Sequence, residues 1–290
     1  MITVNQYYKR LFGEKVYKIS LAGGETCPNR DGSKGVGGCI FCSQAGSGDF
    51  VPQNTLNMDE QIDEGIQKVK SKGATKFIAY FQSFTSTYLP TDILEEKLEK
   101  VIKRENIVGV SVASRPDCLP DTVLDMLERY SKIKPLWVEL GLQTASDKTA
   151  EYINRCYPTS VYFEAAERLA QRNIPFVTHV IFGLPNETEA DMLNTVKAVV
   201  KAKSSGIKIQ LLQILSDSRL AEEYRKGNVT AMDEDEYFAL LKKALLLLPD
   251  DMVLHRLTGD GSKKTLIAPL WCGDKKRVLN KVNALLNEIK

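Results

Sequence analysis

The sequence lacks long apolar runs, and it lacks a large excess of charge of either sign. Its apolar runs are short, such as Ala244 to Leu248, whereas a membrane span needs about 18 apolar residues. The 290 residues include 39 basic and 37 acidic side chains, a formal net charge of +2. We therefore expect no membrane span, and any binding of nucleic acid must come from a local basic patch. The first residues contain no apolar signal-peptide core, so the expected compartment is the reducing cytoplasm.

Histidine is scarce too, and cysteine is unevenly placed. Only His179 and His255 occur, both far in sequence from the group formed by Cys27, Cys39 and Cys42. The cysteine spacing is C-x11-C-x2-C, and clustered cysteines in a reducing compartment indicate a metal site or a catalytic role rather than disulfides. An iron–sulfur cluster held by three thiolates leaves one iron open, and a substrate or cofactor binds at that open position. A zinc site with a remote fourth ligand, or thiols without metal, are the alternatives.

Glycine is concentrated around these cysteines. Eight glycines lie between Gly23 and Gly48, where backbone without side chains can wrap closely around a bulky inorganic group. Backbone amides in such a loop can also donate hydrogen bonds to sulfide. The composition of this segment therefore favours a cluster-binding loop.

Apolar patterns typical of strands and of helices alternate along the chain. Strands are expected at 15–21, 76–82, 107–113, 136–142, 175–182 and 207–215. Helices are expected to begin near Asn57, Thr91, Pro120, Ser160 and Thr188, with Asn57, Thr91 and Thr188 as their caps. This order predicts an α/β fold, a partial (β/α)6 barrel of the TIM type, in which functional groups lie at the carboxyl ends of the strands. The cysteine segment follows the first of these strands.

The tail has a different pattern. Helices are expected near 220–227 and 233–248, a strand at 253–257, and a last helix from about Asp274. We therefore divide the chain into a barrel with the iron–sulfur loop, residues 1–218, and a small C-terminal α/β extension that binds substrate or RNA, residues 219–290.

Polar side chains interrupt or follow the expected strands where a purely structural barrel would not require them. Arg115 precedes a proline at a strand end and is placed for bidentate contact with a carboxylate or phosphate. Glu139 and His179 lie in apolar strands, so each either binds a ligand at the barrel mouth or is satisfied inside the protein, Glu139 by a salt bridge. Gln210 and Gln213 cannot share one face of a strand without a bulge, so we expect one of them to be structural.

Several segments resemble the radical S-adenosylmethionine (SAM) superfamily. The three-cysteine loop after the first barrel strand, with Phe41 directly before Cys42, carries the resemblance, although the usual spacing is C-x3-C-x2-C. The longer first gap resembles a narrower set, the YhcC/YtqA-like group, which are relatives of the elongator catalytic subunit and include MnmL-type tRNA wobble-uridine modification enzymes. The matching segments are Thr26 to Gly32, Gly37 to Ser43, Gly46 to Phe50, Ser114 to Asp117, Glu139 to Thr144, His179 to Pro185 and His255 to Asp260.

The resemblance implies a [4Fe–4S] cluster on Cys27, Cys39 and Cys42, with the amino and carboxylate groups of SAM on the fourth iron. The reduced cluster would pass one electron to the sulfonium, and the resulting 5′-deoxyadenosyl radical would remove a hydrogen atom from the substrate. Arg115 is implied as a further catalytic residue that pairs with the methionyl carboxylate or a substrate phosphate. The implied SAM contacts are Phe41, Gln82, Ser83, Thr85, Ser114, Glu139, Gln143, His179, Ile181, Gly183 and Gln213.

The group also resembles enzymes that remodel the side chain at position 5 of the tRNA wobble uridine, converting carboxymethylaminomethyl to aminomethyl. The implied partners are tRNA, a low-potential electron donor such as flavodoxin or ferredoxin, and a separate SAM-dependent methyltransferase that acts afterwards. A local feature fits: residues 262–290 contain seven basic and two acidic side chains, although such a run is also typical of a solvated helix face. Candidate substrate contacts are Arg115, Asp117, His255, Arg256, Lys275, Lys276 and Arg277.

Two other functions remain open from the sequence. One is a radical SAM enzyme that acts on a small metabolite or a protein, and the other is a non-catalytic zinc or iron–sulfur binding module. Cys272 lies between an apolar run and the basic tail and is a candidate redox partner near a substrate entrance. Cys118 and Cys156 are expected to be packing residues.

Overall fold

The computed structural model describes residues 1–46, 48, 51–52, 56–259, 261 and 263–289. Its centre is one parallel sheet of eight strands in the order β1-β9-β7-β6-β5-β4-β3-β2. These strands are β1 (Ile2–Thr3), β2 (Val16–Leu21), β3 (Lys76–Phe81), β4 (Ile107–Ser114), β5 (Leu136–Gln143), β6 (Phe176–Phe182), β7 (Gly206–Leu211) and β9 (Val253–Arg256). A separate antiparallel pair is formed by β8 (Ile214–Leu215) and β10 (Leu266–Ala268).

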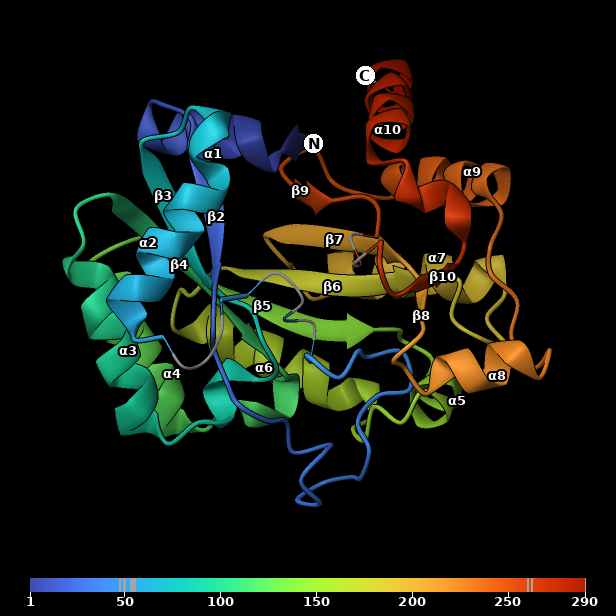
Figure 1. The fold of residues 1–290 in the computed structure, drawn as a ribbon, viewed down its shortest axis with the longest axis horizontal. Helices are drawn as coiled ribbons and strands as arrows, with labels where there is room; N and C mark the ends of the chain where they lie inside the picture. Colours follow the sequence, from blue (N-terminus) through green and yellow to red (C-terminus); the bar gives the residue numbers. More distant parts are fainter. Residues whose placement is uncertain (47, 49–50, 53–55, 260, 262, 290) are drawn as a thin grey trace.

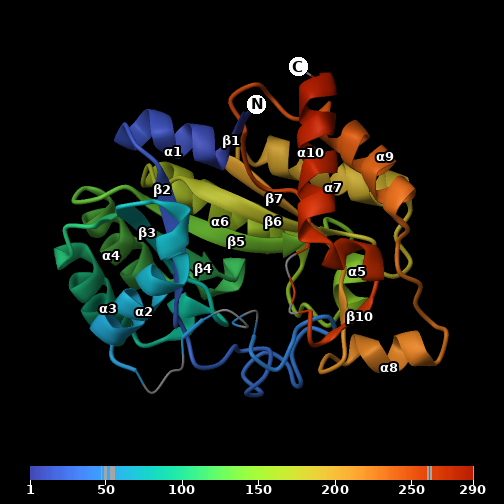
Figure 2. The same ribbon diagram turned by 45° about the horizontal axis from the view of Figure 1, so that its top comes forward.

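Helices pack on the outer face of the curved sheet, and together they form the predicted partial barrel (Figures 1 and 2). The loop between β2 and α2, which contains the three clustered cysteines, lies at the opposite end of the molecule from α1 in Figure 1. The helices are α1 (Val4–Phe12), α2 (Met58–Val69), α3 (Thr91–Lys103), α4 (Asp121–Ser131), α5 (Asp147–Tyr152), α6 (Thr159–Gln171), α7 (Glu189–Lys201), α8 (Leu220–Arg225), α9 (Glu234–Leu245) and α10 (Lys275–Ile289).

Local sequence signals account for two of the helix starts. Asn57 accepts a hydrogen bond from the Glu60 amide at 3.0 Å, and the Glu60 carboxylate accepts one from the Asn57 amide at 2.9 Å. Thr188 and Asp191 make the same reciprocal pair before α7. Each pair satisfies two amides that the helix itself leaves without partners, so both expected starts are confirmed.

Three expectations need correction. Thr91 is the first residue of α3 rather than its cap, because Pro90 occupies the cap position and gives no side-chain hydrogen bond. The sixth expected strand is split, with β7 ending at Leu211 and β8 leaving the main sheet. Helices α1 and α5 were not expected from the apolar pattern, since α5 has only six residues and α1 covers the end of the barrel rather than its outer face.

Side chains inside the barrel form layers, because alternate residues of each strand point inward. The layer nearest α1 is apolar, and α1 closes it with Tyr8, whose ring lies 5.7 Å from that of Trp137. That layer contains Tyr8, Val16, Ile78, Trp137 and Val177. One inward position further along the strands the side chains are charged or polar, and the cysteine loop lies beyond them. The barrel therefore has an apolar base and a polar interior.

The C-terminal region shares the main sheet. Strand β9 pairs in parallel with β1 on one side and β7 on the other. The sheet thus runs across the expected division at residues 218 and 219, and that division stays a prediction. Among the described residues, no helix is both long enough and apolar enough to span a membrane.

Candidate active site

The cysteine loop is fixed by backbone contacts on both sides. The Ile40 amide donates to the Ile153 carbonyl at 3.1 Å, and the Leu220 amide donates to the Ile40 carbonyl at 2.8 Å. Cys39 and Cys42 are joined by a tight turn in which the Cys42 amide donates to the Cys39 carbonyl at 3.1 Å. The turn that contains these two cysteines is therefore held between the end of α5 and the start of α8.

Glycine is required at one point of this loop. Gly38 has a φ of +75°, and a Cβ there would lie 2.9 Å from the Arg30 side chain. Arg30 in turn donates to the Gln44 carbonyl at 2.8 Å and stacks over the Phe84 ring at 5.2 Å. The close approach of Arg30 thus ties the loop before Cys39 to the loop after Cys42.

The thiols of Cys27, Cys39 and Cys42 line one cavity of about 180 Å³. Burial, together with the negative charge that Cys42 and Cys27 would carry, raises the pKa of Cys39 to about 12. Without a metal the Cys39 thiol therefore resists ionising, whereas a metal centre supplies the positive charge that a thiolate needs. The three cysteines fit a cluster on these grounds.

A single metal ion fits less well. Within the described residues, no three histidine, cysteine, aspartate or glutamate side chains converge closely enough to hold one ion. A closed zinc site needs four convergent donors. The thiols instead surround a cavity, which suits a cluster of several irons.

Arg115 does not present its guanidinium to an external ligand as the sequence predicted. Its Nε and Nη2 atoms each donate to an oxygen of Asp117 at 2.9 Å, and Lys34 contacts the same carboxylate at 3.1 Å. The bidentate partner of Arg115 is therefore Asp117, two residues later in the chain. The Asp117 carboxylate is in turn paired with both Arg115 and Lys34. The remaining nitrogen, Nη1, lies 4.0 Å from the Cys27 sulfur, so Arg115 places positive charge beside a cysteine of the loop.

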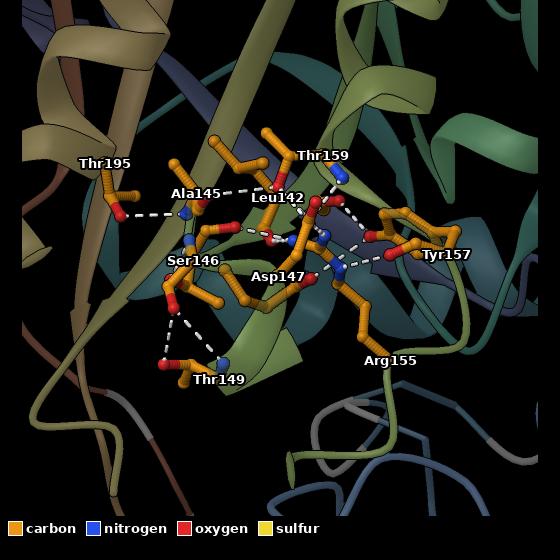
Figure 3. Close-up of polar contacts among 12 residues, drawn as sticks. Leu142, Ala145, Ser146, Asp147, Thr149, Arg155, Tyr157, Thr159 and Thr195 are labelled. Atoms are coloured by element: carbon orange, nitrogen blue, oxygen red, sulfur yellow. Dashed lines mark hydrogen bonds and ion pairs between the residues drawn. The ribbon is translucent and has the colours of Figure 1, made fainter. Parts of the chain in front are cut away.

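A buried arginine that sequence reasoning missed holds the end of β5. Arg155 donates to the carbonyls of Leu142 at 2.7 Å, Thr144 at 2.6 Å and Tyr157 at 3.0 Å (Figure 3). It also contacts Asp147, whose carboxylate accepts from the Thr159 amide at 2.7 Å. Only 1% of Arg155 is exposed, and the residue lines the cavity. The network fixes the strand end from which Gln143 enters the site.

The charged layer inside the barrel is centred on Glu139, whose side chain is fully buried. Its carboxylate accepts from Lys18 at 2.5 Å, from Ser111 at 2.6 Å, from His179 at 2.7 Å, and from Lys208. Although burial opposes ionisation, Lys18 and Lys208 hold the pKa of Glu139 well below its usual value. The salt-bridge alternative for Glu139 is thus what the structure shows, and its role as an acceptor for SAM stays a prediction.

His179 belongs to the same layer. Its Nε2 atom contacts the Glu139 carboxylate, and its Nδ1 atom lies 3.5 Å from the side-chain nitrogen Nε2 of Gln210. Burial and the charge of Lys208 lower the pKa of His179 to about 4, so the imidazole is neutral at physiological pH. The residue is satisfied inside the protein, but it also lines the cavity.

Amide side chains form the next layer toward the cysteines. Gln82 accepts from the Ser20 hydroxyl at 2.6 Å, and Gln143 accepts from the Tyr157 hydroxyl at 3.2 Å. Gly141 makes room for this arrangement, because a Cβ there would lie 2.4 Å from the Gln143 amide nitrogen. Both glutamines line the cavity with Phe41 and Thr85, as expected of residues that contact SAM.

Other predicted SAM contacts have structural partners. The Ser83 hydroxyl accepts from the Gly23 amide at 3.1 Å and donates to the Gly24 carbonyl at 3.2 Å. Ser114 bonds to the Thr87 hydroxyl and to the Arg115 carbonyl. These hydroxyls fix the loops around the cavity, and their contact with SAM stays a prediction.

The three remaining predicted SAM contacts, Ile181, Gln213 and Gly183, do not line the cavity that contains the cysteines. Ile181 and Gln213 line a second cavity, which shares Phe41, Cys42 and Arg256 with the first. Gln213 is also the structural member of the glutamine pair, since it donates to Cys272 at 2.9 Å and accepts from the Gly261 amide at 2.6 Å. Gly183 lies apart from both cavities and donates its amide to the Met192 sulfur at 3.1 Å.

The predicted substrate contacts in the tail do not gather at the site. His255 packs edge-on against Tyr8 at 6.4 Å, beside the apolar base, and does not line either cavity, whereas Arg256 lines both. Arg277 donates to both oxygens of Glu234 at 2.7 Å. Lys275 and Lys276 begin α10 and line neither cavity.

Cys272 is also placed differently from its predicted redox role. It is buried, and burial raises the pKa of its thiol. Its thiol donates to the Pro269 carbonyl at 3.0 Å, and its sulfur accepts from Gln213. A protonated, buried thiol is a poor nucleophile and a poor redox partner, so Cys272 has a packing role.

The cavity-lining residues that were not predicted as site residues include Tyr80, Arg155, Tyr157 and Lys208. Lys208 occupies an inward position of a strand whose other inward residues are apolar or amide-bearing, and a lysine in that pattern is the signal that could have identified it. Ser47, Asp49, Phe50, Asp260, Ser262 and Lys290, which belong to segments singled out in the sequence, lie outside the described residues.

A parallel half-barrel with three cysteines in the loop after its first barrel strand, above a polar interior, defines the radical SAM class of proteins. The sequence profile described as "Radical SAM superfamily" matches residues 23–199, and that described as "Radical_SAM C-terminal domain" matches residues 204–288. The first match covers more than half of the chain, so the chain belongs to the radical SAM superfamily.

Individual relatives agree with this assignment. The chain is 42% identical to YtqA of Bacillus subtilis (strain 168) over 282 residues, which cover 97% of the chain and 88% of that relative. It is 36% identical to YhcC of Escherichia coli (strain K12) over 280 residues, covering 96% and 90%. Identity to the tRNA-2-methylthio-N(6)-dimethylallyladenosine synthase of Endomicrobium trichonymphae is 25%, over 58% of this chain and 40% of that protein.

A solved structure supports the fold. The Elp3 protein of the archaeon Methanocaldococcus infernus, solved with residues 1–46 deleted, matches with a TM-score of 0.65 at 14% identity. The match covers 87% of this chain and 58% of that chain, so this chain spans little more than half of its length.

Proposed function

We propose that the chain is a radical SAM enzyme that binds a [4Fe–4S] cluster through Cys27, Cys39 and Cys42 and modifies the tRNA wobble uridine, converting a carboxymethylaminomethyl group to aminomethyl. The observation that carries the enzyme proposal is the placement of all three thiols around one cavity that continues into the barrel interior. Support for a tRNA substrate comes from the relative whose name describes a tRNA adenosine synthase.

When bound, the cluster and SAM supply one-electron cleavage of the SAM carbon–sulfur bond and removal of a substrate hydrogen atom by the 5′-deoxyadenosyl group. The balanced reaction consumes SAM, the carboxymethylaminomethyl group and water, and it yields methionine, 5′-deoxyadenosine, the aminomethyl group and glyoxylate. SAM is the net two-electron oxidant, the substrate carbon–nitrogen bond breaks, and water supplies the aldehyde oxygen of glyoxylate. A low-potential donor of the flavodoxin or ferredoxin class would supply the electron that starts the reaction, and the substrate would return one electron as its carbon–nitrogen bond is oxidised to an imine that water hydrolyses.

The side chains around the cavity have three tasks in this proposal. Arg115 places positive charge near the Cys27 sulfur and is itself held by Asp117. The carboxamides of Gln82 and Gln143 lie between the cysteines and the charged layer, where they can orient the polar groups of SAM. The glycine-rich loop lines the cavity through Gly38 and Gly46, where it can limit the access of water to a reactive group.

The C-terminal region supplies the proposed contact with tRNA. Arg256 lines both cavities, and the start of α10 carries Lys275 and Lys276. A separate SAM-dependent methyltransferase would act on the aminomethyl product. Six free cysteines agree with a reducing compartment such as the cytoplasm.

A small acidic metabolite is a second candidate substrate, favoured by one observation. Arg277 and Lys281 of the basic tail are paired with Glu234 and Asp235 of α9, which weakens the case for a tRNA-binding surface there.

Product analysis separates these candidates. The reconstituted protein is incubated anaerobically with SAM, a chemical reductant and tRNA that carries carboxymethylaminomethyl uridine. We expect 5′-deoxyadenosine, aminomethyl uridine and glyoxylate in equal amounts, and none of them with Cys39→Ala, whereas Cys118→Ala, a matched change of a buried thiol outside the trio, retains activity. Production of 5′-deoxyadenosine without any change in the tRNA would contradict the tRNA substrate and leave the small-metabolite candidate.

A further inference from the structure

The charged layer of the barrel contains more basic than acidic side chains. Lys18 and Lys208 share the single carboxylate of Glu139, and their ammonium groups lie 4.7 and 4.6 Å from the centre of the Tyr80 ring. Arg256, which has an interaction of its own, lines the same cavity as Glu139 and Lys208. Among the described residues that line this cavity below its amide layer, Glu139 is the one acid.

Surplus positive charge inside a protein is costly unless an anion accompanies it, because a buried charge loses its hydration. One lysine would neutralise Glu139. The second lysine has no carboxylate of its own among these contacts. A further negative charge bound in the layer would supply its missing counter-charge. The ring of Tyr80 offsets some of the cost by cation–π attraction, which keeps both lysines in place without neutralising them.

The two lysines differ in access to the cavity. Lys208 lines it together with Tyr80, His179 and Arg256, whereas Lys18 contacts Glu139 but is not among the lining residues. The same cavity reaches the three cysteines. An anion bound at Lys208 would thus lie inside the barrel, across the amide layer from the cysteine loop.

We propose that the charged layer is the binding site for a carboxylate of the substrate, with Lys208 and Arg256 as its cationic donors. Two cations around a small cavity match a single carboxylate, which is the acidic group at the end of a carboxymethylaminomethyl side chain. The identity of that side chain rests on the proposed function, whereas the acid site rests on the cavity and its charges. Bound in this way, the carbon next to the carboxylate lies on the side of the site that faces the cysteines.

Titration of Lys208 gives the site a pH signature. The groups that face this lysine are Glu139 on β5, Lys18 on β2, His179 on β6, Tyr80 on β3 and Arg256 on β9. Burial, together with the charges of Lys18 and Arg256, lowers the pKa of Lys208 to about 7 in spite of the attraction of Glu139. A carboxylate ligand favours the charged ammonium, so binding near pH 8 takes up a proton.

The test uses two small probes that differ only in charge at the acid end. N-methylglycine and its primary amide, N-methylglycinamide, are titrated by calorimetry into the reconstituted, SAM-loaded protein. We expect the acid to bind at least about tenfold tighter than the amide, the gain typical of one charge-assisted contact. Repeating the titration in buffers of different ionisation enthalpy is expected to show proton uptake for the acid alone.

Matched lysine variants assign the effect to one side chain. Lys208→Met should reduce the tenfold preference to within about twofold of parity, whereas Lys18→Met, which removes the other partner of Glu139, should retain it. If Lys208→Met does not fold, the double variant Glu139→Gln with Lys208→Met removes one charge of each sign and gives the same expected loss. Absence of an acid preference in the native protein, or an equal loss in both lysine variants, overturns the proposal.

The tRNA reaction separates this proposal from the proposed function. Conversion of carboxymethylaminomethyl uridine by Lys208→Met at the native rate would overturn the acid site and leave the tRNA function intact. A Lys208-dependent preference for N-methylglycine in a protein that leaves tRNA unchanged would instead support the acid site and contradict the tRNA function.

Discussion

Basic side chains gather in two regions of the molecule, and the regions differ in how their charge is balanced. On α10, Arg277 and Lys281 each meet an acidic residue of α9 at 2.7 to 3.0 Å, in contact with solvent. Inside the barrel, Lys18 and Lys208 share one buried carboxylate. Exposed pairs contribute little because water solvates either partner alone, whereas buried charges depend on one another. The interior, rather than the tail, is therefore where basic residues indicate a ligand.

Removing the shared carboxylate should give the largest effect. Glu139→Gln leaves two buried lysines without their counter-charge, and we expect a loss of about 3 to 5 kcal/mol in the free energy of unfolding. Urea denaturation followed by circular dichroism measures it. The double variant Glu139→Gln with Lys208→Met should recover a large part of the loss, and a Glu139→Gln protein as stable as the native one would contradict the interior account.

The arginine at the end of β5 should give the next largest effect. Arg155→Met removes the side-chain donor that the buried carbonyls of Leu142 and Thr144 share, so we expect a loss of about 2 to 3 kcal/mol in unfolding free energy. Arg168→Met is the matched control, because Arg168 pairs with Asp121 at the surface. Equal losses in the two variants would show that burial does not set the importance of these arginines.

The interior should also respond to pH in a way that the tail does not. Lys208 has a pKa of about 7 when folded and an ordinary value of 10.5 when unfolded. Between these values the unfolded chain holds a proton that the folded protein lacks, so this group makes stability rise with pH, by up to about 1.4 kcal/mol per pH unit. Unfolding measured from pH 7 to 9.5 should therefore show a shallower rise in Lys208→Met. If the native protein and Lys208→Met showed the same dependence of unfolding free energy on pH, Lys208 would be solvated and would have an ordinary pKa.

The smallest effect is expected at the tail. Arg277→Ala removes an exposed pair with Glu234, and we expect a change in melting temperature close to the error of measurement that disappears in high salt. Differential scanning fluorimetry at low and high salt measures it. A large change that persists at high salt would mean that the two regions do not differ as described.

Much of the fold could be predicted from the sequence because its signals are local. Alternating apolar residues located the six barrel strands, and the pairs Asn57 with Glu60 and Thr188 with Asp191 located two helix starts. Helix α1 could not be assigned a place, since its role as a plug depends on Tyr8 meeting Trp137, which lies 129 positions later. Strand β9 joins the main sheet through pairing with β7, where Gly206 meets Val253, 47 positions later.

The candidate site could be predicted in the part that has a motif. The spacing of Cys27, Cys39 and Cys42 identified residues that do line one cavity. The contact of Arg115 with Asp117 was not predicted, because nothing local shows that Asp117 turns back to meet its guanidinium, and its contact with a ligand stays a prediction. The charged layer depends on Lys18, Glu139 and Lys208 from three strands, and only the closure of the sheet brings them together.

The most direct test of the account is the iron content of the anaerobically reconstituted protein, measured with its electron paramagnetic resonance spectrum before and after SAM is added. We predict about four irons per chain, a reduced-cluster signal that shifts when SAM binds, and loss of both in Cys27→Ala, Cys39→Ala and Cys42→Ala. Binding of one zinc ion instead, or full iron content in any of the three variants, would contradict the claim that these thiolates hold a cluster above the cavity.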